Sequence, residues 1–205
     1  IRANSNWKIV EVTPDNAPIR QLARILASIN GGSTDTIYDA LWQDEHALTA
    51  VSQEIFGSDN PDLFLIIDQF EELFTVVDDP AVIEHYLDLL YFGVTDQESS
   101  IRIVTTLRAD FYHKPLEYPV FGTLVGDSTV IIEPMKPEEL ERAITKPAET
   151  VGVTITPHLA SIMISDVSAR PGTLPMLQYA LYNLFEQRKG DIIGFARQGL
   201  ADPDW

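Results

Sequence analysis

The stretch Leu63–Thr75, LFLIIDQFEELFT, constrains this chain more than any other part of it. Its first five residues are apolar without interruption, and aspartates stand on both sides of them. Such a run predicts a strand buried on both faces of a parallel sheet. Asp68 follows the run directly, so we expect it at the carboxyl end of the strand, where open α/β sheets bind their ligands.

Three carboxylates crowd the end of this predicted strand, on Asp68, Glu71 and Glu72. Neighbouring carboxylates repel one another and resist burial unless a cation or hydrogen bonds compensate them. Magnesium held through water by one carboxylate and by nucleotide phosphates would provide that compensation, and this favours a Walker B strand. The alternative is a structural strand followed by an acidic first helical turn, which suits the helix dipole. The stretch alone leaves both interpretations open.

Composition narrows the class of protein. The 205 residues carry a formal net charge of −17, which argues against binding nucleic acid or an anionic membrane through bulk charge. Cysteine is absent, which excludes disulfides and thiolate metal sites and is compatible with a cytoplasmic location. No apolar run of the given sequence is long enough to span a membrane, and its first residues show no signal-peptide pattern. Because the chain begins with Ile1 instead of Met, we expect it to be a piece of a longer protein.

Apolar runs and helical spacing predict an α/β region followed by helices. Strands are expected at Trp7–Val12, Leu63–Ile67, Ile101–Leu107 and Val130–Ile132. Helical spacing follows Pro18, spans residues 36–56 and follows Asp79-Pro80, so the sheet should be parallel. A change of pattern near Pro134 predicts an α/β core at residues 1–135 and a helical subdomain with a tail at 136–205.

Other catalytic patterns are weak or absent in the sequence. The four histidines form no cluster with ligand spacing, and neither G-x-S-x-G nor H-E-x-x-H occurs. The segment Gly31-Gly32-Ser33-Thr34 is slightly similar to a phosphate loop, but no lysine follows it. We therefore interpret that segment as a linker.

Four segments together resemble the novel STAND NTPases, which are AAA-related P-loop ATPases, usually bacterial, found in multidomain signalling proteins. The segments are LFLIIDQFEELFT, TTLRADFYHKPLEYPVFGTL, EELERAITKPAETVGV and RPGTLPMLQYALYNLFEQR, and the resemblance runs from about Trp7 to Arg188. It implies an α/β fold with a P-loop NTPase-like parallel sheet, flanking helices and a small helical subdomain. It also favours the Walker B interpretation.

The resemblance implies ATP and Mg²⁺ as cofactors and assigns roles at the strand end. Asp68 would coordinate Mg²⁺, and Gln69 stands where many AAA-type ATPases have the catalytic glutamate. Glu71, three positions after the aspartate, would orient the attacking water, with Glu72 as second choice.

The resemblance assigns nucleotide contacts to two further residues. Arg108 would be the sensor arginine that contacts the γ-phosphate, and a structural salt bridge to Glu71 or Asp68 is the alternative. Pro175 resembles the proline of the G-x-P motif that packs near the nucleotide base. That match is imperfect because Gly172 lies three residues before it instead of two.

A phosphate loop of the form G-x-x-x-x-G-K-[ST] is absent, because the chain contains no Gly-Lys dipeptide. In the family this loop and its strand precede a segment like Trp7–Thr13, so we expect them upstream of Ile1. The resemblance places the missing strand between Ile101–Leu107 and Val130–Ile132. We therefore expect the 205-residue chain alone to be inactive, to bind ATP weakly and to be poorly soluble through its open strand edge.

Two hypotheses of function follow. The first is the nucleotide-switch core of a STAND ATPase, whose ATP-bound form opens to form a homo-oligomer and whose ADP-bound form is closed. Its partners would be the effector and sensor domains of the same polypeptide. The alternative is a catalytically inactive interaction or scaffold domain with the same fold. An acidic adaptor with no nucleotide history is disfavoured by the TLRADF and PGTLP segments.

Overall fold

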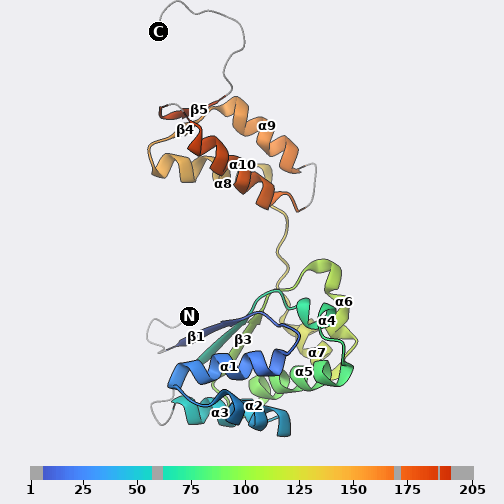
Figure 1. The fold of residues 1–205 in the computed structure, drawn as a ribbon. Helices are drawn as coiled ribbons and strands as arrows, with labels where there is room; N and C mark the ends of the chain where they lie inside the picture. The colour runs from blue at the N-terminus through green and yellow to red at the C-terminus, as the bar shows by residue number, and fades with distance from the viewer. Residues whose placement is uncertain (1–6, 57–61, 169–171, 189, 195–205) are drawn as a thin grey trace, which may run out of the picture. The chain divides into compact units, whose positions relative to one another are not determined.

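The computed structural model describes residues 7–56, 62–168, 172–188 and 190–194 (Figure 1). The chain divides into two compact units, Ile1–Val130 and Ile131–Trp205. No helix in the described ranges is both long enough and apolar enough to cross a membrane.

The described part of the first unit contains a parallel sheet with the strand order β1-β2-β3. The strands are β1 at Lys8–Val12, β2 at Leu63–Ile67 and β3 at Ile101–Thr105. Leu65 pairs with Val10 on one side and with Ile103 on the other, so β2 is the central strand. The prediction of parallel strands at these three places is confirmed.

Helices connect and cover these strands, and their ends follow local sequence signals. They are α1 (Pro18–Asn30), α2 (Thr34–Gln43), α3 (Ala47–Phe56), α4 (Glu72–Thr75), α5 (Pro80–Thr95), the 3₁₀ helix η2 (Ala109–Phe111), α6 (His113–Leu116) and α7 (Pro119–Ser128). Gly31 ends α1 with a φ of 73°, and the Ser33 side chain then caps α2 by accepting from the Thr36 amide. The predicted linker is thus confirmed for Gly31, Gly32 and Ser33, while Thr34 already belongs to α2.

Helical spacing over residues 36–56 does not produce one continuous helix. Asp44 is extended, with a φ of −144°, and it ends α2. Its carboxylate accepts a hydrogen bond from the His46 amide at 2.9 Å, and α3 then begins at Ala47. Aspartate competes with the helix in this way because its short side chain bonds nearby backbone amides.

The core of the first unit lies on one face of the sheet. Side chains that alternate along the strands are at most 7% exposed there, namely Val10, Val12, Leu63, Leu65, Ile67 and Ile101. Helix α1 packs on β1 and α5 packs on β3 (Figure 1). On the opposite face Phe64 and Ile66 are half-buried, while Ile9 is 66% and Val104 is 47% exposed. The prediction that β2 is buried on both faces is therefore wrong for the described residues.

The predicted strand at Val130–Ile132 is not formed. These residues have no regular structure, and they are 80%, 80% and 87% exposed. Within the described ranges the sheet ends at β3, and this run pairs with no strand. The amides and carbonyls of a strand need hydrogen-bond partners on a neighbouring strand. Without such a neighbour the apolar run does not become a strand.

The second unit is mainly helical, as predicted for the chain from Pro137 onward. It contains α8 (Pro137–Thr150), α9 (Pro157–Ser168) and α10 (Leu174–Glu186), and the short strands β4 (Thr154–Ile155) and β5 (Ile192–Ile193) pair in parallel. At the start of helix α8 the Glu139 carboxylate accepts a hydrogen bond from the Lys136 amide at 2.8 Å. The core of the second unit consists of buried apolar side chains, including Ile144, Val153, Ile155, Leu159, Leu177 and Ile193.

Candidate functional site

The candidate site lies where β2 and β3 end side by side. Asp68 follows β2, and Thr106 to Arg108 follow β3. The Asp68 amide donates to the Val12 carbonyl at 2.9 Å, and the Thr106 amide donates to the Ile67 carbonyl at 2.9 Å. Because neighbouring parallel strands end at one edge of a sheet, these bonds bring the Asp68 and Thr106–Arg108 segments together.

Thr106 links the two chain segments through its hydroxyl. Its Oγ1 donates to Asp68 Oδ1 at 2.5 Å and accepts from the Gln69 amide at 3.0 Å. The Phe70 amide donates to the Thr106 carbonyl at 2.9 Å. The turn after β2 is therefore held by the residue that follows β3.

Gln69 adopts a left-handed backbone conformation, with a φ of 53°, although it is not glycine. A residue of this kind is strained by about 1–3 kcal/mol and persists only where its surroundings hold it in place. The bonds to Thr106 hold it on one side. On the other side Phe70 is 1% exposed, with its ring centroid 5.6 Å from that of Phe74 and 5.9 Å from that of Phe121.

Glu71 and Glu72 occupy different positions, although they are adjacent in sequence. Glu71 Oε2 accepts a hydrogen bond from the Arg108 amide at 3.3 Å, which draws this carboxylate toward the segment after β3. Glu72 is the first residue of α4, where a carboxylate suits the helix dipole. Both side chains are half-buried, and Leu73 beside them is fully buried. Of the two carboxylates, Glu71 is therefore the one that contacts the segment after β3.

The Arg108 side chain is engaged elsewhere. Its guanidinium donates to both oxygens of Asp110, from Nε at 3.2 Å and from a terminal nitrogen at 2.8 Å, and it lies 5.7 Å from the Phe111 ring centre. The hydrogen bond from Arg108 lowers the pKa of the Asp110 carboxyl, and the same bond raises the pKa of Arg108. The predicted alternative of a salt bridge from Arg108 to Glu71 or Asp68 is not formed, because Asp110 is nearer along the chain.

Sequence reasoning missed Thr106 and Asp110. The signal for Thr106 was a hydroxyl residue near the carboxyl end of the predicted strand Ile101–Leu107. The signal for Asp110 was an acidic residue two positions after the arginine. Neither signal is specific without the coordinates, since both residue types are common in loops.

Pro175 lies in the second unit, in the first turn of α10, and its side chain is exposed. Proline suits this position because the first turn of a helix does not need its missing amide hydrogen. That local role explains the residue without a ligand. Contact of Pro175 with a nucleotide base stays a prediction.

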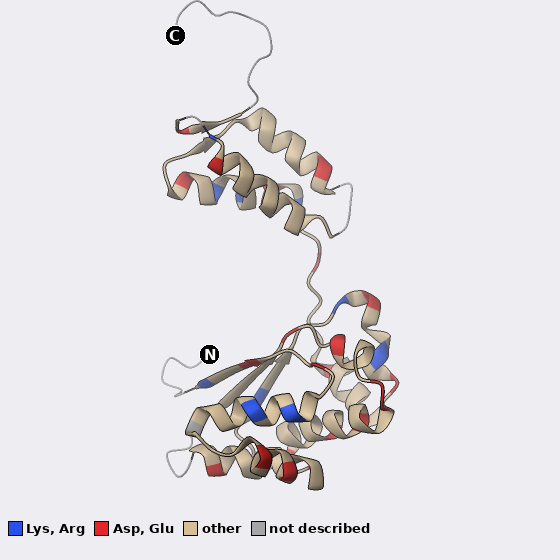
Figure 2. Ribbon diagram, in the orientation of Figure 1, with Lys and Arg blue, Asp and Glu red and all other residues tan. Residues whose placement is uncertain are grey.

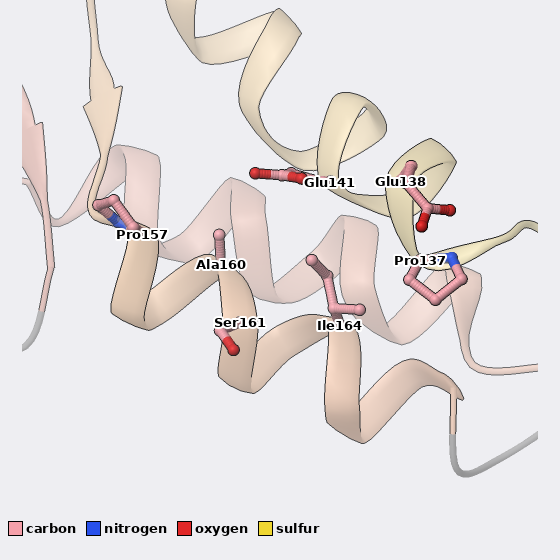
Figure 3. Close-up of a pocket in the computed structure, with 7 residues that line it drawn as sticks. All are labelled: Pro137, Glu138, Glu141, Pro157, Ala160, Ser161 and Ile164. Atoms are coloured by element: carbon pink, nitrogen blue, oxygen red, sulfur yellow. The ribbon is translucent and has the colours of Figure 1, made fainter.

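A hollow of about 330 Å³ lies in the second unit between α8 and α9 (Figure 3). Glu138 and Glu141 line it on the α8 side, and Ala160, Ser161 and Ile164 line it on the α9 side. None of the predicted site residues borders it. Because two carboxylates and no cationic side chain line this hollow, it does not suit the phosphates of a nucleotide.

Neither the distribution of charged residues nor the placement of possible metal ligands indicates a further site in the described ranges. Lysine and arginine are scattered over both units instead of forming one patch (Figure 2). No group of three or more His, Asp or Glu side chains is placed to hold a metal there. This does not conflict with magnesium at Asp68, because Mg²⁺ in nucleotide sites is held by one or two carboxylates together with water and phosphate oxygens.

The donor set after β2 suits such a metal. Asp68 is half-buried, and Thr106 engages only its Oδ1. Within the described residues, no ion pair involves Asp68, Glu71 or Glu72. Carboxylate oxygens without a cationic partner, at the carboxyl edge of a parallel sheet, are suitable ligands for a hard divalent cation.

Comparison with known protein families identifies the family of this chain. The family model described as Novel STAND NTPase 1 matches residues 1–198. A search of curated proteins gave no match. The family match covers nearly the whole chain, including Asp68, Glu71 and Glu72 and most of the second unit. The chain therefore belongs to the Novel STAND NTPase 1 family, a family of nucleotide-binding domains.

Proposed function

We propose that this chain is the nucleotide-dependent switch core of a STAND ATPase in a multidomain signalling protein. The observation that supports this most is that the segment after β3 holds both Asp68 and Glu71, which follow the central strand. Asp68 would hold the Mg²⁺ of Mg-ATP, since Oδ2 accepts no hydrogen bond from the described residues. Magnesium, when bound, would neutralise phosphate charge and orient the nucleotide.

Glu71 is the residue we assign to orienting the attacking water. Its carboxylate is anchored by the Arg108 amide, so its position is set by backbone and not by a mobile side chain. Glu72 lacks such an anchor among the described residues and starts α4 instead. The structure therefore favours Glu71 over Glu72 for this role, which requires a fixed carboxylate near the reacting water.

Arg108 is the residue we assign to sensing the γ-phosphate. Its partner Asp110 is exposed, with 58% of its side chain accessible, and 67% of the Arg108 side chain is accessible. Exposed ion pairs of this kind add little stability, so a phosphate can replace Asp110 as the partner of the guanidinium. Release of Arg108 from Asp110 would then couple the nucleotide state to the η2 and α6 segment.

The fold proposed for the complete domain includes a further strand beside β3. The open edge of β3 and the exposed apolar run Val130–Ile132 both support this proposal. A strand inserted there would give both of them backbone partners. The preceding residues of the parent protein would supply it, together with a phosphate loop.

The test uses the natural protein with all the residues its gene encodes around this chain, because residues 1–205 contain no G-x-x-x-x-G-K-[ST] pattern. Calorimetry with Mg-ATP and a phosphate-release assay are applied to the wild type, Glu71→Gln and the matched control Glu72→Gln. We expect Glu71→Gln to bind Mg-ATP normally and to hydrolyse it about 10²-fold more slowly, a typical loss for this kind of catalyst. Glu72→Gln should change the rate far less.

Other outcomes separate the alternatives. A wild type that binds no nucleotide supports the alternative function, an interaction or scaffold domain with the same fold. Binding with equal hydrolysis rates in the wild type and Glu71→Gln removes Glu71 from the mechanism. A larger loss in Glu72→Gln than in Glu71→Gln assigns the role to Glu72.

A further inference from the structure

We propose that Thr106 is a positioning residue for Asp68, and that its hydroxyl selects which carboxylate oxygen faces the metal. This inference rests on the proposed function, because it concerns the same Mg²⁺ site. It adds a residue that lies outside the acidic motif and reaches that motif from the neighbouring strand.

The direction of the hydrogen bonds at Thr106 is fixed by chemistry. A backbone amide can only donate, so the bond from the Gln69 amide to Oγ1, at 3.0 Å, uses the hydroxyl as an acceptor. The single hydroxyl proton is then free to point at Asp68 Oδ1, 2.5 Å away. Asp68 Oδ1 must therefore accept this bond from the hydroxyl.

The geometry leaves one Asp68 oxygen for a ligand. Oδ1 is occupied by the Thr106 hydroxyl, and among the described residues no hydrogen bond to Oδ2 is present. Fixing one oxygen also fixes the plane of the carboxylate, so Oδ2 keeps one direction. Removing a partner that orients a metal ligand in this way commonly weakens metal binding by about 10- to 100-fold. We expect a loss of the same order here.

The backbone bonds of Thr106 do not depend on its side chain. Its amide donates to Ile67 and its carbonyl accepts from Phe70, both at 2.9 Å. Valine has the same branched shape at Cβ and keeps these two bonds, but it cannot donate to Asp68 or accept from Gln69. Thr106→Val therefore removes the hydroxyl contacts while leaving the connection between the two segments in place.

Thr105 provides a matched control one position earlier. It is the last residue of β3, it pairs with Ile67 in the register, and its side chain is exposed. Successive side chains along a strand point to opposite faces of the sheet, so the side chains of Thr105 and Thr106 point in opposite directions. Thr105→Val makes the same chemical change without touching the Asp68 hydrogen bond.

The experiment measures ATP hydrolysis by the full natural protein at saturating ATP while the Mg²⁺ concentration is varied. We expect Thr106→Val to raise the half-saturating Mg²⁺ concentration by about 10-fold or more. Thr106→Ser, which restores a hydroxyl, should return it to near the wild-type value, and Thr105→Val should leave it unchanged. ATP binding in EDTA and the melting temperature are measured beside it, because a purely structural role would move the melting temperature without a Mg²⁺-specific shift.

The outcomes distinguish this proposal from the proposed function. A wild type without Mg²⁺-dependent nucleotide binding overturns both. An active wild type in which Thr106→Val and Thr105→Val need the same Mg²⁺ concentration overturns only the role of Thr106, and so does a Thr106→Ser variant as impaired as Thr106→Val. If Thr106→Val does not fold, Thr106→Ala is measured against Thr106→Ser with the same expectation.

Discussion

Two apolar runs of this chain, Leu63–Ile67 and Val130–Ile132, are alike in sequence and opposite in structure. Leu63, Leu65 and Ile67 are fully buried in the central strand of the sheet. Val130, Ile131 and Ile132 are at least 80% exposed and have no regular structure. Both runs are rich in residues that favour strands, so strand propensity does not explain the difference.

The difference lies in the availability of backbone partners. β2 has a parallel neighbour on each side, and its alternate side chains meet helices on one face. In the described ranges, the sheet ends at β3 before it reaches the second run. Apolar side chains gain from burial only when a surface is present to bury them, and unpaired backbone groups keep their bonds to water. An apolar run is therefore a candidate strand, and its neighbours decide whether it becomes one.

Hydrogen exchange of the 205-residue chain gives the largest contrast between the two runs. We expect the amides of Phe64–Ile67 to exchange at least about 10³-fold more slowly than those of residues 131–132, relative to an unfolded chain. The central amides open only with the whole unit, whose stability is of the order of 5 kcal/mol or more, while the exposed run needs no opening. Mass spectrometry of peptides from the two segments measures this ratio. Equal protection would show that Val130–Ile132 has found a partner in solution.

Truncation of the central strand gives the next largest effect. Leu65→Ala should lower the free energy of unfolding of the first unit by about 2–5 kcal/mol, because it leaves a cavity in the fully buried face. Ile9→Ala is the control, since Ile9 lies in β1 but is 66% exposed on the opposite face of the sheet. Urea denaturation measures both. A loss for Ile9→Ala as large as that for Leu65→Ala would contradict the one-sided core.

A polar substitution in the exposed run should have the smallest effect. Ile131→Ser is expected to change the free energy of unfolding of the 205-residue chain by less than about 0.5 kcal/mol, because the side chain is 80% exposed. The same substitution in a protein that includes the proposed additional strand sharpens the comparison. There we expect a clear destabilisation, since the proposed additional strand would bury Ile131. A loss above about 1 kcal/mol in the short chain itself would mean that the run already packs against another surface.

The candidate site shows the same division between sequence and structure. The position of Asp68 could be predicted, because a carboxylate directly after a buried apolar run must lie at the carboxyl edge of the sheet. Glu71 was singled out by the family resemblance. Their partners could not be predicted, because Thr106 is distant in sequence and meets Asp68 only through the pairing of β2 with β3. The orientation of Arg108 was also beyond the sequence, since two carboxylates at the strand edge and Asp110 all compete for one guanidinium.

By itself the sequence determined the order of the strands and helices, the acidic edge and many helix ends, because these depend on local periodicity and on capping residues such as Ser33 and Asp79. Only the tertiary structure decided which face of β2 is buried, which apolar run pairs, and which residues hold Asp68 and Arg108. Those outcomes depend on groups that meet through space. Burial and hydrogen bonding are satisfied by whichever neighbours the fold supplies, and a local pattern does not contain them.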